Sequence, residues 1–190
     1  MKILEERILR DGRYLGNGIL KVDNFINHQV DPALMDACGV EFARIFANLG
    51  ATRILTAEIS GIAPALMAGR HLALPVVYAR KSKPITMPDT VYLTVAPSHT
   101  KGHMVELIVS PEYLAAGEKV LIIDDFLASG ATILALVRLA RAAGSEVVGV
   151  GTLIEKTFEG GRAALSSLGI PIHSLAMISS MDDNGIHFAA

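Results

Sequence analysis

The sequence predicts an α/β fold in which a mainly parallel central sheet is flanked by helices on both faces. Apolar runs such as 120–123 lack the alternation of a half-exposed strand, so each is typical of a strand that is buried on both faces. Segments with helical spacing separate these runs, and Gly50, Gly144 and Gly169 stand where such helices are expected to end. Alternating strands and helices of this kind indicate an α/β domain.

The first fifty residues are expected to hold two helices around a turn-rich stretch. Residues 3–9 carry apolar side chains at helical spacing, and residues 11–27 are rich in glycine and asparagine, which indicates an irregular or hairpin-like segment. Asp31 is the expected N-cap of a second helix, with Pro32 at its first position.

From residue 53 onward, strands and helices alternate. The expected strands are 53–57, 75–79, 119–123, 146–154 and 172–178, and the expected helices are 62–72, 131–143 and 161–168. Two apolar stretches between residues 90 and 109 surround a polar tip and predict a hairpin inserted into this series. The 190 residues are expected to form a single domain.

The composition excludes several classes of protein. An apolar content of 51% is enough for a large core, and the net charge of −2 lacks the positive field of a protein that coats nucleic acid. Cys38 is the only cysteine, so no intrachain disulfide can form, and the histidines lack metal-ligand spacing. No apolar run approaches the ~20 residues needed to cross a bilayer. We expect a cytoplasmic protein that binds neither nucleic acid nor membrane.

One motif after the strand at 120–123 predicts a site for a sugar phosphate. Asp124 and Asp125 are followed by two spacers and then by a small, hydroxyl-bearing turn made of Ala128, Ser129, Gly130, Ala131 and Thr132. The turn offers backbone N–H groups and hydroxyls to a phosphate, and carboxylates accept hydrogen bonds from sugar hydroxyls. The motif lacks the lysine of a P-loop and the spacing of the dinucleotide fingerprint. The competing interpretation is a solvated strand end.

The thirteen residues 120–132 resemble the signature of the phosphoribosyltransferase family. The resemblance implies the type I phosphoribosyltransferase fold, a homodimer, and phosphoribosyl diphosphate bound with Mg²⁺. It assigns catalysis to Asp124 and Asp125, which hold the ribose hydroxyls directly or through Mg²⁺. It assigns binding of the 5-phosphate to the turn 128–132.

Two further loops correspond to diphosphate-binding segments of the family. Ser60 and Gly61 follow the first parallel strand, and Arg80 and Lys81 follow the next one. By themselves, these residues are equally well explained as a common turn and a solvated charged face.

The insertion at 82–103 corresponds to the mobile flap that closes over diphosphate in this family, which would exclude water from a carbocation-like ribose. Lys101 and His103 at its tip are candidates to contact diphosphate. A solvated hairpin tip is the alternative for both.

The purine is expected to lie between an N-terminal hood, residues 1–31, and the loop that begins at Glu155. The run 18–32 resembles bacterial xanthine phosphoribosyltransferases, which implies that Leu20 packs on the purine and that Asn27 pairs with its 2-oxo edge. The ammonium of Lys156 only donates hydrogen bonds, so it favours a purine carbonyl over the amino group of adenine.

Phe158 is a candidate to stack on the base, and a place in the core or at the rim is equally consistent with the sequence. Ser129 departs from the asparagine that the xanthine branch commonly carries, and this departure concerns the phosphate turn.

The function that the resemblance implies is transfer of phosphoribose to xanthine in purine salvage, forming xanthosine 5′-monophosphate and diphosphate. Transfer to adenine or to hypoxanthine and guanine is one alternative. Another is a transcriptional regulator that senses phosphoribosyl diphosphate, but only about thirty residues precede the first core helix, too few for a winged helix.

Overall fold

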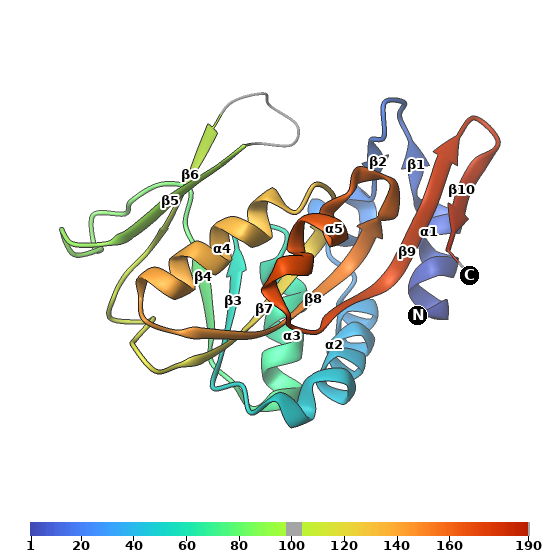
Figure 1. The fold of residues 1–190 in the computed structure, drawn as a ribbon. Helices are drawn as coiled ribbons and strands as arrows, with labels where there is room; N and C mark the ends of the chain where they lie inside the picture. The colour runs from blue at the N-terminus through green and yellow to red at the C-terminus, as the bar shows by residue number, and fades with distance from the viewer. Residues whose placement is uncertain (98–103, 190) are drawn as a thin grey trace.

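The computed structural model describes residues 1–97 and 104–189, which are built around a six-stranded sheet of order β10-β9-β8-β7-β3-β4 (Figure 1). Its strands are β3 (Arg53–Ala57), β4 (Val76–Ala79), β7 (Lys119–Leu127), β8 (Glu146–Lys156), β9 (Ile172–Asp182) and β10 (Gly185–Phe188). All neighbours are parallel except β10, which pairs antiparallel with β9. The predicted mainly parallel α/β sheet is confirmed.

Helices cover both faces of the sheet and enclose two apolar clusters (Figure 1). The helices are α1 (Lys2–Asp11), α2 (Pro32–Phe46), α3 (Ile62–Leu72), α4 (Ala131–Ala142) and α5 (Gly161–Leu165). One cluster contains Phe42 and Phe46 of α2, and the other contains Leu136 of α4. The predicted start of α2 is confirmed, because the Asp31 carboxylate accepts hydrogen bonds from the backbone N–H groups of Ala33 and Leu34, both at 3.1 Å.

Two small hairpins stand beside the carboxyl edge of the sheet (Figure 1). The hood hairpin pairs β1 (Arg13–Tyr14) with β2 (Leu20–Lys21), and the flap hairpin pairs β5 (Tyr92–Pro97) with β6 (Met104–Val109). The hairpin predicted between residues 90 and 109 is therefore confirmed in its two strands. Lys101 and His103 lie outside the described residues.

Three elements differ from the sequence prediction. Strand β7 was expected to end at Ile123, but it continues to Leu127 because Asp124 pairs with Thr152 and Phe126 with Ile154 of β8. Strand β8 likewise extends through Lys156, which was expected in a loop. Strand β10 was not predicted from the sequence, and its antiparallel pairing lengthens β9 to Asp182. The acidic pair therefore lies on the strand itself.

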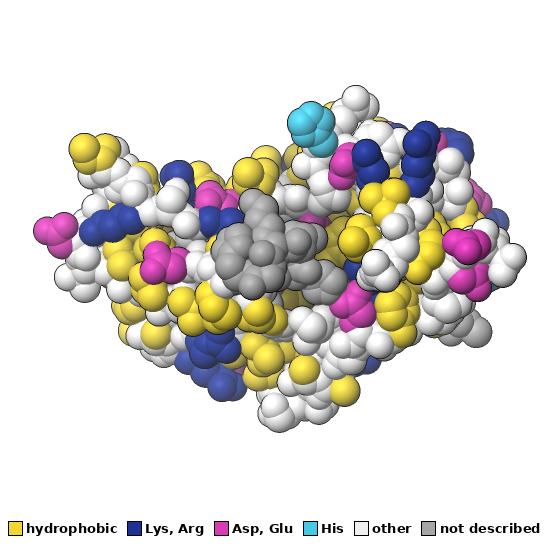
Figure 2. Space-filling model, turned by 90° about the horizontal axis from the view of Figure 1, so that it is seen from above, with side chains coloured by type: hydrophobic (Ala, Val, Ile, Leu, Met, Phe, Trp, Pro, Cys, Tyr) yellow, Lys and Arg dark blue, Asp and Glu magenta, His cyan; other side chains and the backbone are white. Residues whose placement is uncertain are grey.

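The surface agrees with the composition. Within residues 1–97 and 104–189, every helix falls short of the length and apolar character required to span a bilayer. Seen from above the carboxyl edge, the basic side chains are interspersed with acidic and apolar ones (Figure 2).

Candidate functional site

A cavity of about 590 Å³ opens at the carboxyl ends of β3, β7 and β8, between the hood hairpin and the flap hairpin. Such an edge is the usual ligand site of an open α/β sheet. The predicted site residues that line it are Leu20, Asn27, Ser60, Gly61, Lys81, Asp124, Asp125, Ala128, Ser129, Gly130, Ala131, Thr132 and Lys156. The structure thus brings together segments that are up to 136 positions apart in the chain, from Leu20 to Lys156.

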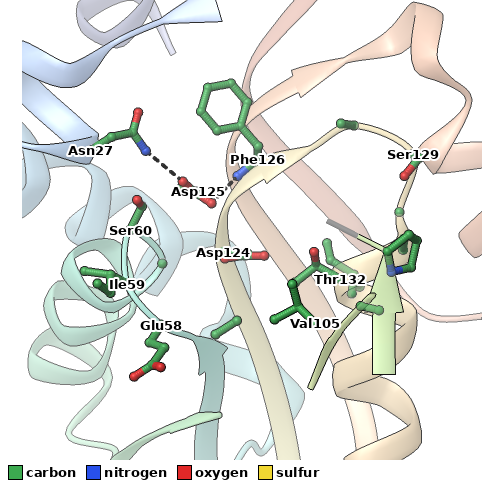
Figure 3. Close-up of a pocket in the computed structure, with 18 of the residues that line it drawn as sticks. Asn27, Glu58, Ile59, Ser60, Val105, Asp124, Asp125, Phe126, Ser129 and Thr132 are labelled. Atoms are coloured by element: carbon green, nitrogen blue, oxygen red, sulfur yellow. Dashed lines mark hydrogen bonds between the residues drawn. The ribbon is translucent and has the colours of Figure 1, made fainter. Parts of the chain in front are cut away.

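The acidic pair divides between two sides of the cavity. Asp124 and Asp125 are successive strand residues, so their side chains leave opposite faces of β7. Asp125 points toward the hood, where its Oδ2 accepts a hydrogen bond from Asn27 Nδ2 at 3.0 Å, and Asp124 lies nearer Thr132 (Figure 3). One carboxylate therefore faces the hood while the other faces the start of α4.

Burial dominates the electrostatics of this pair. Asp124 is only 4% exposed, and desolvation followed by the charge of Asp125 raises its pKa well above the ordinary value. Desolvation also raises the pKa of Asp125, while hydrogen bonds from the Phe126 backbone and from Asn27 oppose the shift. The two carboxyls therefore hold protons more readily than exposed aspartates do.

The turn between β7 and α4 has the geometry of a phosphate cradle. Gly130 adopts φ +81° and occupies the N-cap of α4, where a Cβ would stand 3.2 Å from the carbonyl oxygen of Gly161. The first N–H groups of a helix have no acceptor within it, and Ser129 and Thr132 add hydroxyls. The cradle is neutral, as the sequence predicted.

Gly161 supports this turn from behind. A Cβ on Gly161 would collide with the carbonyl oxygen of Ala128 and would stand 2.9 Å from the backbone nitrogen of Gly130. Only a glycine allows α5 to approach the turn this closely.

The loop after β3 borders the acidic pair. Gly61 lies against Asp124 so closely that a Cβ would collide with its Oδ1 and with Thr56 Oγ1. Ser60 lines the cavity beside it, and the Glu58–Ile59 peptide is cis. The loop after β4 is tied to this loop, since Glu58 Oε1 accepts a hydrogen bond from the backbone N–H of Lys81 at 2.6 Å.

Arg80, predicted to bind diphosphate, does not line the cavity. Its Nε lies 3.4 Å from Glu58 Oε2, and its side chain borders a separate cavity of about 420 Å³. The backbone of Arg80 forms a bridge with Ile108, so this residue joins β4 to the flap hairpin. Of the two basic residues, the structure therefore places Lys81 in the site and Arg80 beside it.

The hood side of the cavity carries a buried ammonium. Lys156 Nζ donates to Gly18 O at 2.8 Å and to Glu159 Oε1 at 3.0 Å, and it lies 5.6 Å from the centre of the Phe126 ring. An ammonium has three protons, so these two acceptors use two of them. Lys156 thereby connects the end of β8 to the hood hairpin.

Phe126 is the aromatic residue that sequence reasoning missed. It was interpreted as a spacer, but it ends up in the cavity wall because β7 continues past the acidic pair (Figure 3). Phe158, the predicted candidate for stacking, is 47% exposed and does not line the cavity. The long apolar run of β8 could have indicated this placement, because residues late in β8 pair with Phe126 and so extend β7.

The acidic groups of the cavity suit a metal that arrives with a ligand. No cluster of three or more histidine, cysteine or carboxylate side chains that could hold a metal occurs in the described ranges. Mg²⁺ commonly takes one or two protein carboxylates and completes its shell with substrate phosphates and water. Asp124 and Asp125 fit that role, because a cation would offset the mutual repulsion that raises the pKa of Asp124.

The sequence family agrees with this geometry. The family described as "Phosphoribosyl transferase domain" matches residues 39–162. The chain belongs to the phosphoribosyltransferase family. The resemblance seen in residues 120–132 is confirmed, and the two acids and the phosphate cradle lie inside the matched range of this phosphoribosyltransferase.

Two curated phosphoribosyltransferases are similar over almost the whole chain. A xanthine phosphoribosyltransferase of Deinococcus deserti is 50% identical over 185 residues, which cover 97% of this chain and 96% of the relative. A xanthine phosphoribosyltransferase of Listeria monocytogenes serotype 4b is 48% identical and covers 99% of this chain and 98% of its own length.

Among solved structures, an adenine phosphoribosyltransferase of Thermoanaerobacter pseudethanolicus has a TM-score of 0.74 at 26% identity. The match covers 92% of this chain and 99% of that structure, which supports the predicted type I phosphoribosyltransferase fold.

Proposed function

We propose that the protein transfers the 5-phosphoribosyl group of phosphoribosyl diphosphate to xanthine, forming xanthosine 5′-monophosphate and diphosphate. The neutral cradle beside the acidic pair, of which Asp124 is buried, is the observation that carries the transferase half of the proposal. The xanthine half is supported by Lys156 and Asn27 on the base side and by the two xanthine relatives at 50% and 48% identity.

Different residues of the cavity bind the three parts of a phosphoribosyl diphosphate. The cradle of residues 128–132 takes the 5-phosphate, Asp124 and Asp125 take the ribose hydroxyls, and Ser60, Gly61 and Lys81 face the diphosphate. The purine N9 attacks the anomeric carbon while the bond to diphosphate breaks, and the electron pair leaves with diphosphate. The carboxylates stabilise the positive charge that develops on the ribose.

The acidic pair also supports a proton transfer. The attacking purine loses a proton, and a carboxyl with a raised pKa is a better acceptor near neutral pH than an ordinary aspartate. Asp125 is the nearer of the two to the hood, because it is hydrogen-bonded to Asn27.

Magnesium would be held by Asp124 or Asp125 together with the sugar diphosphate, where it would neutralise the charge of the leaving group. The side chains of the cavity do not neutralise the diphosphate by themselves. Among residues 1–97 and 104–189, the cavity lining contains four acidic side chains, Asp23, Glu58, Asp124 and Asp125, against three lysines, Lys21, Lys81 and Lys156.

Selection of the base rests on Lys156. Its ammonium donates only, so a purine carbonyl can accept from it, whereas the amino group of adenine cannot. Asn27 adds amide contacts toward the 2-oxo edge that distinguishes xanthine from hypoxanthine, and Leu20 provides an apolar wall. Adenine is therefore the disfavoured alternative, although the solved structure reported above is an adenine enzyme at 26% identity.

The test is a direct transfer assay. The purified protein is incubated with phosphoribosyl diphosphate, Mg²⁺ and each of xanthine, hypoxanthine, guanine and adenine, and the nucleotides are separated by chromatography. We expect xanthosine 5′-monophosphate as the main product and its loss when the metal is chelated. If no base yields a nucleotide, the transferase proposal is wrong.

A matched pair of lysine variants tests the base assignment. Lys156→Met removes the buried ammonium and is expected to lower kcat/KM for xanthine by about 100-fold, since a charged hydrogen bond to a buried group is lost. Lys119→Met changes an exposed lysine at the opposite end of β7 and is expected to leave the kinetics unchanged. Adenine as the preferred substrate of the wild-type protein would contradict the role of Lys156.

The protein is further proposed to act as a cytoplasmic homodimer. Large apolar side chains remain exposed near the β4 edge of the sheet, including Ile59, Leu66, Tyr78 and Ile85, and a second copy could cover them. Light scattering coupled to gel filtration measures the state directly, and a mass near 20.2 kDa would contradict a dimer.

A further inference from the structure

The segment between β8 and α5 joins the base side of the cavity to the phosphate cradle. It begins at Glu155 and Lys156, passes through the short turn Thr157–Glu159 and ends at Gly161 and Arg162. Lys156 lines the cavity, and Gly161 supports the cradle from behind. Its conformation therefore bears on two parts of the site at once.

The first residue of this segment carries a buried carboxylate that accepts three hydrogen bonds. Glu155 is 1% exposed. Its Oε1 accepts from Arg162 Nε at 2.9 Å, and its Oε2 accepts from Arg162 at 2.5 Å and from Ser174 Oγ at 2.6 Å. Such partners offset the cost of removing a carboxylate from water.

The planar guanidinium of Arg162 links the two ends of this segment to each other and to β9. Nε and one terminal nitrogen grip the two oxygens of Glu155, and Nη1 donates to Ile172 O at 3.0 Å on β9. Glu155 lowers the energy of the charged guanidinium, and its hydrogen bonds raise the pKa of Arg162. Three fixed donors hold the start of α5 at one position on the sheet.

That position sets the contact between α5 and the cradle. Arg162 directly follows Gly161, whose Cα has no room for a Cβ beside Ala128 O and the nitrogen of Gly130. A small displacement of α5 would thus open or compress the turn that forms the cradle. Interiors of this density transmit such shifts to their neighbours.

We propose that Glu155 and Arg162 are positioning residues that hold the phosphate cradle in its binding geometry through Gly161. This inference rests on the proposed function, because it assigns the 5-phosphate to the cradle. Neither side chain lines the cavity, so the pair acts through the backbone it fixes and not by touching the substrate.

The conservative variant Arg162→Lys tests the pair. It keeps the positive charge beside Glu155 but replaces the bidentate fork with a single ammonium, so the variant is expected to fold. We expect calorimetry with Mg²⁺ and phosphoribosyl diphosphate to give a Kd about tenfold weaker than that of the wild type, since small misplacements of a binding group have effects of this size. Arg141→Lys, at an exposed position late in α4, is the control and should bind as the wild type does.

A double-mutant cycle with Gly161→Ala separates positioning from general destabilisation. If Arg162 acts through Gly161, the double variant will bind less weakly than the product of the two single effects predicts. A folded Arg162→Lys variant with an unchanged Kd would overturn the proposal, and so would multiplicative effects in the cycle.

Binding and turnover are measured on the same samples so that the two proposals can fail separately. A wild-type protein that binds phosphoribosyl diphosphate but forms no nucleotide would refute the proposed function and still test the pair. Wild-type protein that does not bind the sugar diphosphate at all would refute both.

Discussion

A single segment, residues 124–132, supplies most of the side of the cavity that we propose for the sugar phosphate, whereas the side proposed for the base draws on Leu20, Asn27 and Lys156 from three separate elements. The first side offers backbone N–H groups and hydroxyls at a helix start. The polar groups of the second side are hydrogen-bonded to other protein groups, Asn27 to Asp125 and Lys156 to Gly18 and Glu159. We infer that the sugar-phosphate side is preformed and that the base side exchanges protein partners for ligand.

The largest expected effect falls on the residue shared by the two sides. Asp125→Asn removes a carboxylate that we propose to bind the ribose and that accepts a hydrogen bond from Asn27. We expect kcat/KM to fall by about 100- to 1,000-fold, the usual cost of losing one electrostatic stabiliser of a transition state. Steady-state kinetics with xanthine measures it. A loss below tenfold would show that Asp124 alone suffices.

Asn27→Ala should affect the base side selectively. It removes the amide proposed for the 2-oxo edge, and we expect kcat/KM for xanthine to fall about 30-fold, as for a lost hydrogen bond to a buried group. The KM for phosphoribosyl diphosphate should change little. A further consequence is a higher pKa of Asp125, since the Asn27 hydrogen bond lowers it. The acidic limb of the pH profile should therefore move to higher pH.

Two glycines with almost the same backbone conformation allow a matched test of the sugar-phosphate side. Gly130 in the cradle has φ +81°, and Gly117 has φ +80° with open space around its Cα. The positive φ should make alanine cost about 1–2 kcal/mol of stability at either position, and at position 130 the new Cβ would also stand 3.2 Å from Gly161 O. Only Gly130→Ala should raise the KM for phosphoribosyl diphosphate, by about tenfold. Equal kinetics of the two variants would argue against the cradle.

The pH dependence of stability is the smallest expected effect. The pKa of Asp124 is raised in the folded state, while an unfolded aspartate titrates near ~4. The folded state therefore binds the proton more tightly, and the contribution to stability is full below pH ~4 and is lost as pH rises through the raised value. Asp124→Asn should remove this loss. Urea unfolding without ligand at pH 4, 6 and 8 measures the free energy of unfolding. Relative to the wild type, this free energy should increase for the variant as the pH rises.

The sequence predicted the two sides of the cavity unequally for physical reasons. Residues 124–132 are contiguous, so their spacing alone indicated acids beside a phosphate turn. Leu20, Asn27 and Lys156 converge only through the packing of the hood, and they were found through the family resemblance. Spacing could not show that Lys156 holds Gly18 or that Asn27 holds Asp125, because these bonds join residues 138 and 98 positions apart.

Strand ends were the weak point of the prediction. Pairing between β7 and β8 continues beyond the apolar run 120–123, and Phe126 therefore lies in the wall of the cavity. Phe158 lies at the surface. Arg80 was expected to face diphosphate, yet the structure pairs it with Glu58 and directs its backbone to the flap hairpin. Propensity describes one strand at a time, whereas these placements depend on neighbouring strands.

Helix α4 connects the cradle to the flap hairpin. It begins at the phosphate turn, and Arg138 in its middle donates to Thr94 Oγ1 at 3.0 Å and to Val95 O at 2.8 Å on β5. We therefore expect a phosphate bound at the first turn of α4 to affect β5 through the contacts of Arg138. Amide hydrogen exchange at Thr94 and Val95 should slow when ribose 5-phosphate binds, which would make these two residues, neither of which lines the cavity, reporters of a ligand at the start of α4.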